Sequence, residues 1–408
     1  MARHYTTRDF FRQMPNALLA HYFQGRGLFG DLDFAALKEA HPEELFTAWL
    51  VLPESERNAM DSQFREIFAM GCEKGFRAIL DEAEWQFRET PEAHVALVEK
   101  LAALANHYER AMVTFLDYPN FWNGAMLFCH ADSLPYWRKR KGFPHQPASV
   151  HEDGRRALAD SIRNYFHRTE GRGNNCVVEA FRRGELDYFF AYPEDYSQQS
   201  IEWVNGTFDR RPHNPAFEVI YVYSEKDGTL DLSFRGSNKA IEPLQGMFAT
   251  AILYLPELPP DPDDERVYDL NPLRERGFQF VFDPASGIEN VAVKKLRLSS
   301  KVVKGDRITL EADAAARREA IYDLLDEVST PLRLRTWNVT QVELAALVAT
   351  KPNEKPKSVT VRITHPNSCS LKYDEVDLRL REMLVASGIE PREPMEGMTV
   401  AETEAAKA

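Results

Sequence analysis

The sequence predicts an α+β protein, with a helical N-terminal domain followed by a mixed, mainly antiparallel sheet body with packed helices. Three observations lead to this prediction. Apolar residues recur at helical spacing through most of residues 1–172. The pairs Asn205-Gly206 and Asp227-Gly228 each separate two strand-like stretches, as the turn of an antiparallel hairpin does. Short runs of β-branched and aromatic residues return after residue 266.

These patterns divide the chain into four parts. We expect a helical domain over 1–172, an antiparallel sheet with one helix over 173–255, a second α+β portion over 266–390 and a disordered tail over 391–408. The second α+β portion either stands alone or continues the preceding sheet. Between the portions 173–255 and 266–390, the proline-rich and acidic segment 256–265 is expected to be an exposed linker.

Prolines, glycines and caps mark the helix boundaries. Pro15 kinks or breaks the first helix and Pro42 opens the second, because proline is tolerated only in the first turn. Gly71 and Gly75 are places where the longest apolar stripe breaks, and Thr90 caps a later helix. Helices are expected over 8–23, 42–53, 54–89, 90–116, 153–167, 241–255, 314–328 and 376–387.

The hairpin around Asp227-Gly228 gives the clearest strand. Leu230 and Leu232 alternate with Asp231 and Ser233, which is the period of a strand with one buried face. We therefore expect Leu232 in the core and Asp231 in water, joined to the preceding strand by a tight two-residue turn. Further strands are expected over 278–283, 291–298, 307–312, 337–350 and 357–364.

Composition bounds the class of protein. Apolar residues make up 44% of the 408 residues and charged residues 28%, which is ordinary for a soluble globular chain. The four cysteines are far apart and form no CxxC pair, which favours a reducing compartment and argues against a structural zinc site. The N-terminal stretch lacks an apolar signal region, and no run of about 18 apolar residues occurs. We expect a cytoplasmic protein with no membrane span, cofactor or metal.

One segment is basic in an acidic chain. Residues 136–183 carry a formal net charge of +6, whereas the rest of the chain carries a net charge of −19. Cations neutralise phosphates and aromatic rings stack on unpaired bases, so we expect this segment to bind a polyanion, DNA or RNA first. The alternative is that it pairs with acidic surfaces of its own chain or of a partner subunit. The candidate residues are Trp137, Arg138, Lys139, Arg140, Lys141, His145, Arg168 and Arg172.

Catalytic motifs are sparse. The sequence has no phosphate-binding GxxxxGK[ST], no HExxH, no GxSxG and no EF-hand loop. The Gly-rich GRGNN stretch precedes a strand and not a helix, so it is interpreted as a tight loop. Alternation places Glu185 and Asp187 on one face of a strand, where carboxylates could bind a divalent cation for phosphodiester cleavage.

The segment RNYFH over 163–167 resembles the Arg-polar…His motif of the helical HEPN ribonucleases. In that family an arginine and a histidine on one helix act on the RNA 2′-hydroxyl and phosphate. The resemblance covers five residues and implies such roles for Arg163 and His167. The family spaces the pair more widely; here three residues intervene, which still places both side chains on one helix face.

Two functional hypotheses follow. The first is a non-catalytic component of a cytoplasmic, bacterial-type assembly that binds protein and, through 137–183, nucleic acid. The second is a metal-dependent or HEPN-like nuclease that uses Arg163, His167, Glu185 or Asp187. The absence of a strong catalytic motif favours the first.

Overall fold

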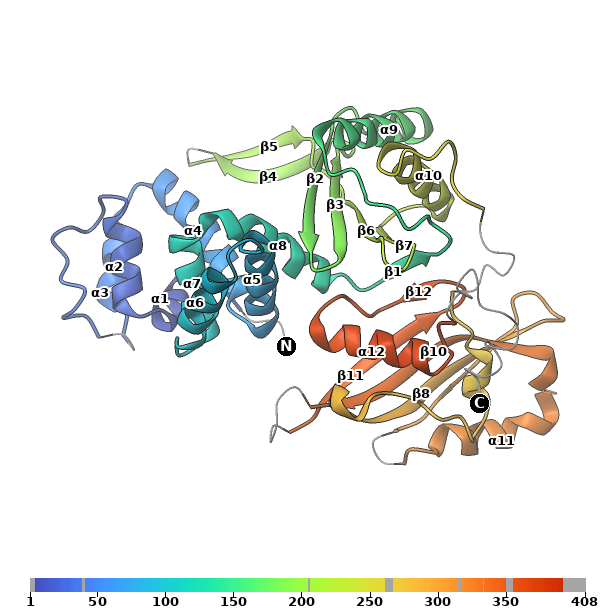
Figure 1. Ribbon diagram of the computed structural model, residues 1–408. Coiled ribbons are helices and arrows are strands. Elements are labelled where there is room, and N and C mark those ends of the chain that lie inside the picture. Colours follow the sequence, from blue (N-terminus) through green and yellow to red (C-terminus); the bar gives the residue numbers. More distant parts are fainter. Residues whose placement is uncertain are drawn as a thin grey trace. The chain divides into compact units, whose positions relative to one another are not determined.

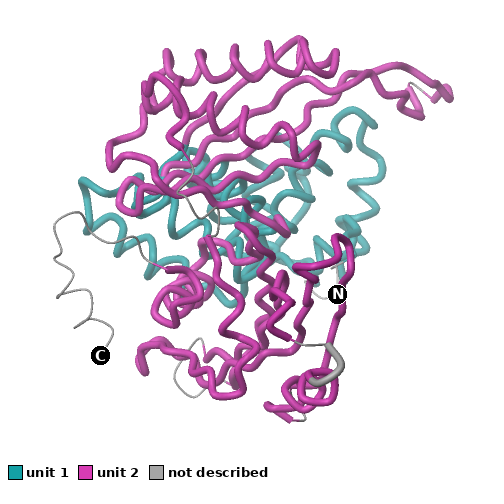
Figure 2. Tube along the Cα trace, turned by 90° about the vertical axis from the view of Figure 1, so that its right-hand side faces the viewer, with its two compact units in different colours: residues 1–133, 181–186 teal, residues 134–180, 187–408 magenta. Residues whose placement is uncertain are grey.

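A computed structural model describes residues 4–38, 41–204, 206–260, 267–314, 317–332, 334–349 and 355–391 (Figure 1). The predicted α+β class is confirmed: a helical N-terminal region precedes a body built on an antiparallel sheet. The chain forms two compact units (Figure 2). Unit 1 comprises residues 1–133 and 181–186, and unit 2 comprises residues 134–180 and 187–408.

Unit 1 is helical, with an aromatic core. Phe64 stacks on Phe10 with ring centroids 4.6 Å apart and meets the edge of Phe11 at 5.5 Å. Tyr22 and Phe23 close the cluster from the next helix, and all five rings are buried. The helices of unit 1 are α1 (Thr7–Gln13), α2 (Asn16–Gln24), α3 (Glu43–Leu50), α4 (Glu54–Met70), α5 (Glu73–Gln86), α6 (Pro91–Ala102), α7 (His107–Asp117) and α8 (Pro119–Ser133).

The helix boundaries of unit 1 confirm one expectation and correct others. The stripe over 54–89 breaks at Gly71, one of the two glycines named for it, because Gly71 packs against the ring of Tyr108 and Cys72 caps α5 with its side chain. The stretch 90–116 is also divided, since Asn106 caps α7 by accepting from the Glu109 backbone N–H at 3.0 Å. Helix α8 was not predicted, because its aromatic residues follow no clear helical stripe.

Unit 2 is built on a ten-stranded sheet. In spatial order its strands are β2 (Cys176–Arg183), β3 (Leu186–Pro193), β6 (Val219–Ser224), β7 (Thr229–Phe234), β1 (Trp137–Arg140), β12 (Ser368–Cys369), β11 (Lys357–Thr364), β10 (Trp337–Val348), β8 (Ile288–Ser300) and β9 (Arg307–Glu311). Its α-helices are α9 (Glu152–Glu170), α10 (Ile241–Ala251), α11 (Ala320–Leu332) and α12 (Glu375–Ala386). Short 3-10 turns cover Asn238–Ala240, Asn271–Arg274, Pro284–Ser286 and Leu334–Thr336.

Two hydrophobic clusters cover this sheet. The first joins β3, β6 and β7 to α9 and α10, and Figure 1 shows both helices beside this part of the sheet. The second joins β8, β10 and β11 to α11 and α12. The two parts are continuous through β1, since Arg138 pairs with Leu232 of β7 and Trp137 with Cys369 of β12. Strand β1 and helix α9, which we expected within a helical domain over 1–172, therefore belong to unit 2.

Some strand predictions are confirmed and others are wrong. The predicted hairpin of β10 and β11 is confirmed, as is the cap of α12, where Asp374 accepts from the Asp377 backbone N–H. No described strand covers 278–283: Phe278, Phe280 and Phe282 alternate, but they pack on the second cluster without ladder pairing. The predicted linker lies partly, and the tail after residue 391 wholly, outside the described residues.

The hairpin of β6 and β7 confirms one expectation and corrects two. Leu232 is buried as predicted, opposite Tyr221. The connection is longer than a two-residue turn, because Ser224 pairs directly with Thr229. Asp231 is only 1% exposed and accepts a hydrogen bond from the Tyr373 hydroxyl, so its expected place in water was wrong. The physical reason is that β7 is an interior strand of the sheet and both its faces are covered.

Candidate protein-binding ribbon

Strands β4 (Gln198–Val204) and β5 (Thr207–His213) form a separate two-stranded sheet, here called the ribbon. Figure 1 shows it projecting from the end of β3. Val204 pairs with Thr207, so the hairpin turn falls where the sequence predicts it. Gly206 has a φ of +74°, a conformation that glycine adopts without strain. Asn205 lies outside the described residues.

One face of the ribbon is apolar. Directly opposite residues of an antiparallel pair project to the same side. Trp203 is opposite Phe208, and Ile201 is opposite Arg210, so these four side chains share a face. Ile201, Trp203 and Phe208 are 66%, 71% and 49% exposed, respectively. The two rings meet edge to face with centroids 5.7 Å apart.

The opposite face is polar. It carries Ser200, Glu202, Asp209 and Arg211, which follow from the same register. Arg211 forms an ion pair with Asp209 at 3.4 Å, and the Ser200 hydroxyl donates to Glu202. The ribbon is therefore amphipathic: one face carries polar side chains that pair with one another, and the other face carries large apolar side chains.

Arg172 anchors the base of the ribbon. Its guanidinium donates to the carboxylates of Asp195 at 2.7 Å and Glu170 at 2.8 Å. The same group lies 3.9 Å from the centroid of the Phe217 ring and 5.3 Å from that of Tyr196. Burial raises the pKa of Asp195, but the hydrogen bonds from Arg172 and from the Tyr196 backbone outweigh it, and the pKa is lowered overall. The charged form of the anchor is thus the stable one near neutral pH.

Backbone hydrogen bonds fix the strands that enter and leave the ribbon. The backbone N–H of Asp195 donates to Pro215 at 2.7 Å, and that of Phe217 donates to Pro193 at 2.9 Å. The predicted tight loop after α9 also contributes, since the Gly173 N–H donates to Glu194 at 2.9 Å. Gly173 has a φ of +84°, which explains the glycine at this position. The ribbon therefore projects from a well-bonded base.

The basic segment is largely engaged within its own chain. Trp137, Lys139 and Arg140 are buried in β1. Arg138 donates to the Asn238 side chain at 2.7 Å, and Lys141 donates to the Pro391 carbonyl at 2.6 Å. Neither of these two partners is an acid; the pairing with an acid that the intramolecular alternative expects occurs at Lys139, whose ammonium pairs with Glu390 at 2.8 Å.

Of the remaining polyanion candidates, some are engaged within the chain and some are exposed. Arg172 anchors the ribbon, and a ring nitrogen of His145 lies 2.9 Å from the Glu225 carbonyl. Arg168 is exposed in the last turn of α9, and His145 keeps an exposed ring. Polyanion binding through these exposed groups stays a prediction.

The catalytic candidates lie in different settings. Arg163 and His167 are both on α9, where Arg163 pairs with Asp160 at 3.2 Å and His167 is exposed. Glu185 lies in the turn before β3, whereas Asp187 is buried within β3, so the expected shared wet face does not exist. Among the described residues, no group of three or more His, Cys, Asp or Glu side chains is arranged to hold a metal ion.

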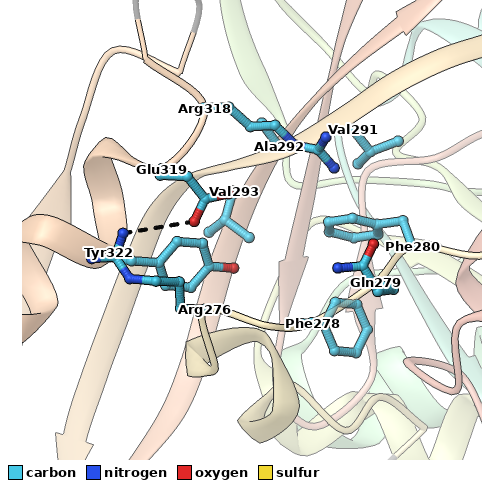
Figure 3. A pocket seen from close by; sticks show the side chains of 10 residues that line it. All are labelled: Arg276, Phe278, Gln279, Phe280, Val291, Ala292, Val293, Arg318, Glu319 and Tyr322. Carbon is cyan, nitrogen blue, oxygen red and sulfur yellow. Dashed lines mark ion pairs between the residues drawn. The ribbon is translucent and has the colours of Figure 1, made fainter.

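A small hollow in unit 2 is lined by Arg276, Phe280 and Tyr322 among others (Figure 3). Its volume of about 100 Å³ is well below the roughly 300–1,000 Å³ that is typical of sites for organic ligands. Arg276 pairs with Glu319 at 3.9 Å and with Asp323 at 2.9 Å. We therefore place no ligand there.

Buried charged and hydroxyl groups meet where β1 joins the two parts of the sheet. The Lys139 ammonium pairs with Glu390 at 2.8 Å, and the Arg381 guanidinium lies 4.3 Å from the centroid of the Tyr373 ring, whose hydroxyl bonds Asp231. Burial raises the pKa of Glu390, but the charges of Lys139 and Arg381 outweigh it and lower the pKa overall. The mutual pairing indicates a structural role in joining the strands.

The sequence contains a signal for the ribbon but not for its function. Ile201 and Trp203 alternate with polar residues, which predicts an amphipathic strand. Such alternation normally means that the apolar side faces the core. Only the three-dimensional arrangement shows that this side is exposed.

Comparison with protein-family models and with curated proteins finds no match to this chain. Within the described part of the chain, the helices are too short or too polar to cross a membrane. Geometry and surface chemistry are therefore the basis for assigning a function.

Proposed function

We propose that this chain is a non-catalytic, protein-binding component of a cytoplasmic assembly, and that its partner docks on the apolar face of the ribbon. The exposure of Ile201, Trp203 and Phe208 on one anchored face is the observation that supports this proposal. Tryptophan and arginine are enriched among the residues that dominate binding energy at protein interfaces, and Arg210 shares this face. The proposed cytoplasmic setting follows from the cysteine pattern.

The face also indicates the chemistry of the partner. Among the described residues, Arg210 makes no ion pair, while its guanidinium lies 5.8 Å from the centroid of the Phe208 ring. A complementary surface would present an apolar depression for Trp203 and a carboxylate for Arg210. The arginine would supply orientation, and burial of the rings most of the affinity.

Site-specific photocrosslinking identifies the partner and tests the face together. A photoreactive phenylalanine analogue replaces Trp203 in one sample and Glu202, on the polar face, in a matched sample. We expect a crosslinked protein from the position 203 sample that is absent from the position 202 sample. Identical crosslinks from both positions would argue against docking on the apolar face.

The affinity of the chain for the purified partner that crosslinking identifies then measures how much the apolar face contributes to binding. Trp203→Ala should raise the Kd by about 30-fold or more, the equivalent of about 2 kcal/mol for a dominant interface residue. Glu202→Ala is the control and should leave the Kd within about threefold of wild type. Sedimentation of the chain alone tests for a second copy as the partner. An unchanged Kd for Trp203→Ala would exclude the proposed site.

A further inference from the structure

The hairpin of β8 and β9 presents two exposed valines in its turn. Val302 and Val303 are 74% and 51% exposed, respectively. Their backbone N–H groups donate to the Ser300 hydroxyl at 3.2 and 3.1 Å. The turn is closed by the Ser300 N–H, which donates to the Asp306 carbonyl at 3.0 Å. The two valines are therefore held outside the core by an ordered turn, and residues 301–304 are here called the tip.

Cations surround the tip. Lys301 and Lys304 flank the two valines, and both lysines are exposed. Arg307, also exposed, begins β9 directly after the turn. The Lys301 N–H donates to the Thr336 carbonyl at 2.8 Å, which brings the preceding residue, the exposed Arg335, close to the turn. Four cations from two parts of the chain thus lie around the valines.

These cations lack acidic partners. Within the described ranges, none of the four forms an ion pair, whereas Glu311 of β9 is engaged by Lys295 at 3.2 Å and by Lys294 at 3.8 Å. Residues 294–311 carry six cations and two acids, a net charge of +4 in a chain of −13. Because the Debye length is about 8 Å at physiological ionic strength, acids farther away are largely screened from the tip.

Together, the exposed valines and the unpaired cations favour an anionic lipid surface over a nucleic acid. At a membrane, apolar side chains leave water, while long cationic side chains reach the lipid phosphates. A nucleic acid would engage the cations but leave the valines in water. Unpaired bases stack on aromatic rings, and residues 300–307 contain none.

We propose that the tip, together with Arg307 and Arg335, contacts the surface of membranes that contain anionic phospholipids. The valines enter the boundary between headgroups and acyl chains, and the four cations lie against lipid phosphates. Such a contact requires no membrane-spanning helix. It goes beyond the proposed docking on the ribbon, which is formed by β4 and β5, and does not depend on it.

Cosedimentation of the full-length protein with lipid vesicles tests this proposal. Vesicles of equal parts phosphatidylcholine and phosphatidylglycerol are compared with vesicles of phosphatidylcholine alone. We expect the protein to sediment with the anionic vesicles and to stay in solution with the neutral ones. Added salt should release it, because the Debye length falls from about 10 Å at 0.1 M to about 3 Å at 1 M.

Substitutions in the tip separate its two contributions. Val302→Thr combined with Val303→Thr keeps the side-chain shape and should weaken vesicle binding about tenfold, because each change replaces a buried methyl group by a hydroxyl. Lys301→Gln and Lys304→Gln should each weaken it about fivefold. All these side chains are exposed, so thermal unfolding should stay as in the wild type.

Matched controls lie in other parts of unit 2. Val281→Thr changes a valine that is 52% exposed, and Lys226→Gln changes an exposed lysine in the turn between β6 and β7. Both should bind the anionic vesicles as the wild type does.

Three vesicle results would overturn the proposal: no binding to the anionic vesicles, equal binding to both kinds, or unchanged binding after the threonine substitutions. Fluorescence anisotropy with a DNA duplex provides a fourth. Duplex binding that requires Lys301 and Lys304 but not the valines, without vesicle binding, would assign the cations to nucleic acid instead.

Discussion

At the scale of single residues, Glu82 is an acid held inside unit 1. It is 1% exposed, and its carboxyl group lies against Gly124 of α8, where an added Cβ would come within 2.5 Å of it. Burial raises the pKa of Glu82 to about 7, while the hydrogen bond from the Gln86 amide, at 2.7 Å, lowers it by less. The neutral form therefore persists in the folded protein to higher pH than in the unfolded chain.

Glu82→Gln should stabilise the protein more at pH 8 than at pH 5. The folded pKa is above the unfolded one, so the wild type loses stability as pH rises from the ordinary carboxyl range through about 7. Glutamine does not ionise, and it should gain about 1–3 kcal/mol at pH 8. Urea unfolding at the two pH values measures this gain. Glu84→Gln, on the exposed side of α5, should show no such difference between them.

Asp231 shows where residue-level sequence analysis succeeds and fails. Alternation correctly predicts that Leu232 is buried, because a strand must direct one set of side chains to a core. It cannot predict the environment of the other set. That environment depends on Tyr373, which is far away in sequence and hydrogen-bonds the buried carboxylate.

At the scale of elements, β1 was the hardest strand to predict. Four residues reading WRKR lack any apolar alternation, and charge normally indicates a solvated loop. The strand forms because β7 and β12 supply its backbone partners, and because Glu390 neutralises Lys139. Both conditions depend on residues that are far away in the sequence, so they cannot be predicted from the local sequence.

The ribbon was predictable as a hairpin but not as a binding surface. Asn205-Gly206 specifies the turn, and the alternation specifies two faces. Whether a hairpin joins the main sheet depends on its base. Here Arg172 and the paired backbone groups at that base direct it away from the sheet.

Arg172→Met should loosen the ribbon, because it removes the ion pairs to Glu170 and Asp195. We expect faster trypsin cleavage after Arg210, in β5, with little change in the cleavage of other elements. Arg168→Met, an exposed change on α9, is the matched control and should be cleaved at the wild-type rate. Equal rates in all three proteins would show that Arg172 does not anchor the ribbon.

At the scale of the whole molecule, the chain enters unit 1 a second time. Residues 181–186, which comprise the end of β2, the turn and the first residue of β3, belong to that unit although the residues on either side belong to unit 2. They bring Arg183, whose guanidinium donates to both oxygens of Asp132 at 2.9 and 3.0 Å and to Asp81 at 2.8 Å. Burial raises the pKa of Asp81, and the Arg183 charge opposes that shift. No local sequence pattern predicts such an insertion.

Arg183→Leu should destabilise the protein by about 3–5 kcal/mol near neutral pH, because it takes the guanidinium away from two carboxylates. The loss should shrink toward pH 5, since the carboxylates in the variant are more easily protonated. Arg182→Leu is the control: that side chain pairs with the exposed Glu185 at 3.7 Å, so its loss should be smaller and nearly independent of pH. Thermal unfolding at both pH values separates the two variants.

The same insertion sets an order of events during protein synthesis. Helices α1 to α8 leave the ribosome before residues 181–186 have been made. A domain encoded first usually folds first. Here the first helices are complete in sequence but still lack Arg183, the cation shared by Asp81 and Asp132. The final packing of unit 1 must therefore wait until translation has passed β2. The folding of the helical unit is completed only after the first strands of that region have been synthesised.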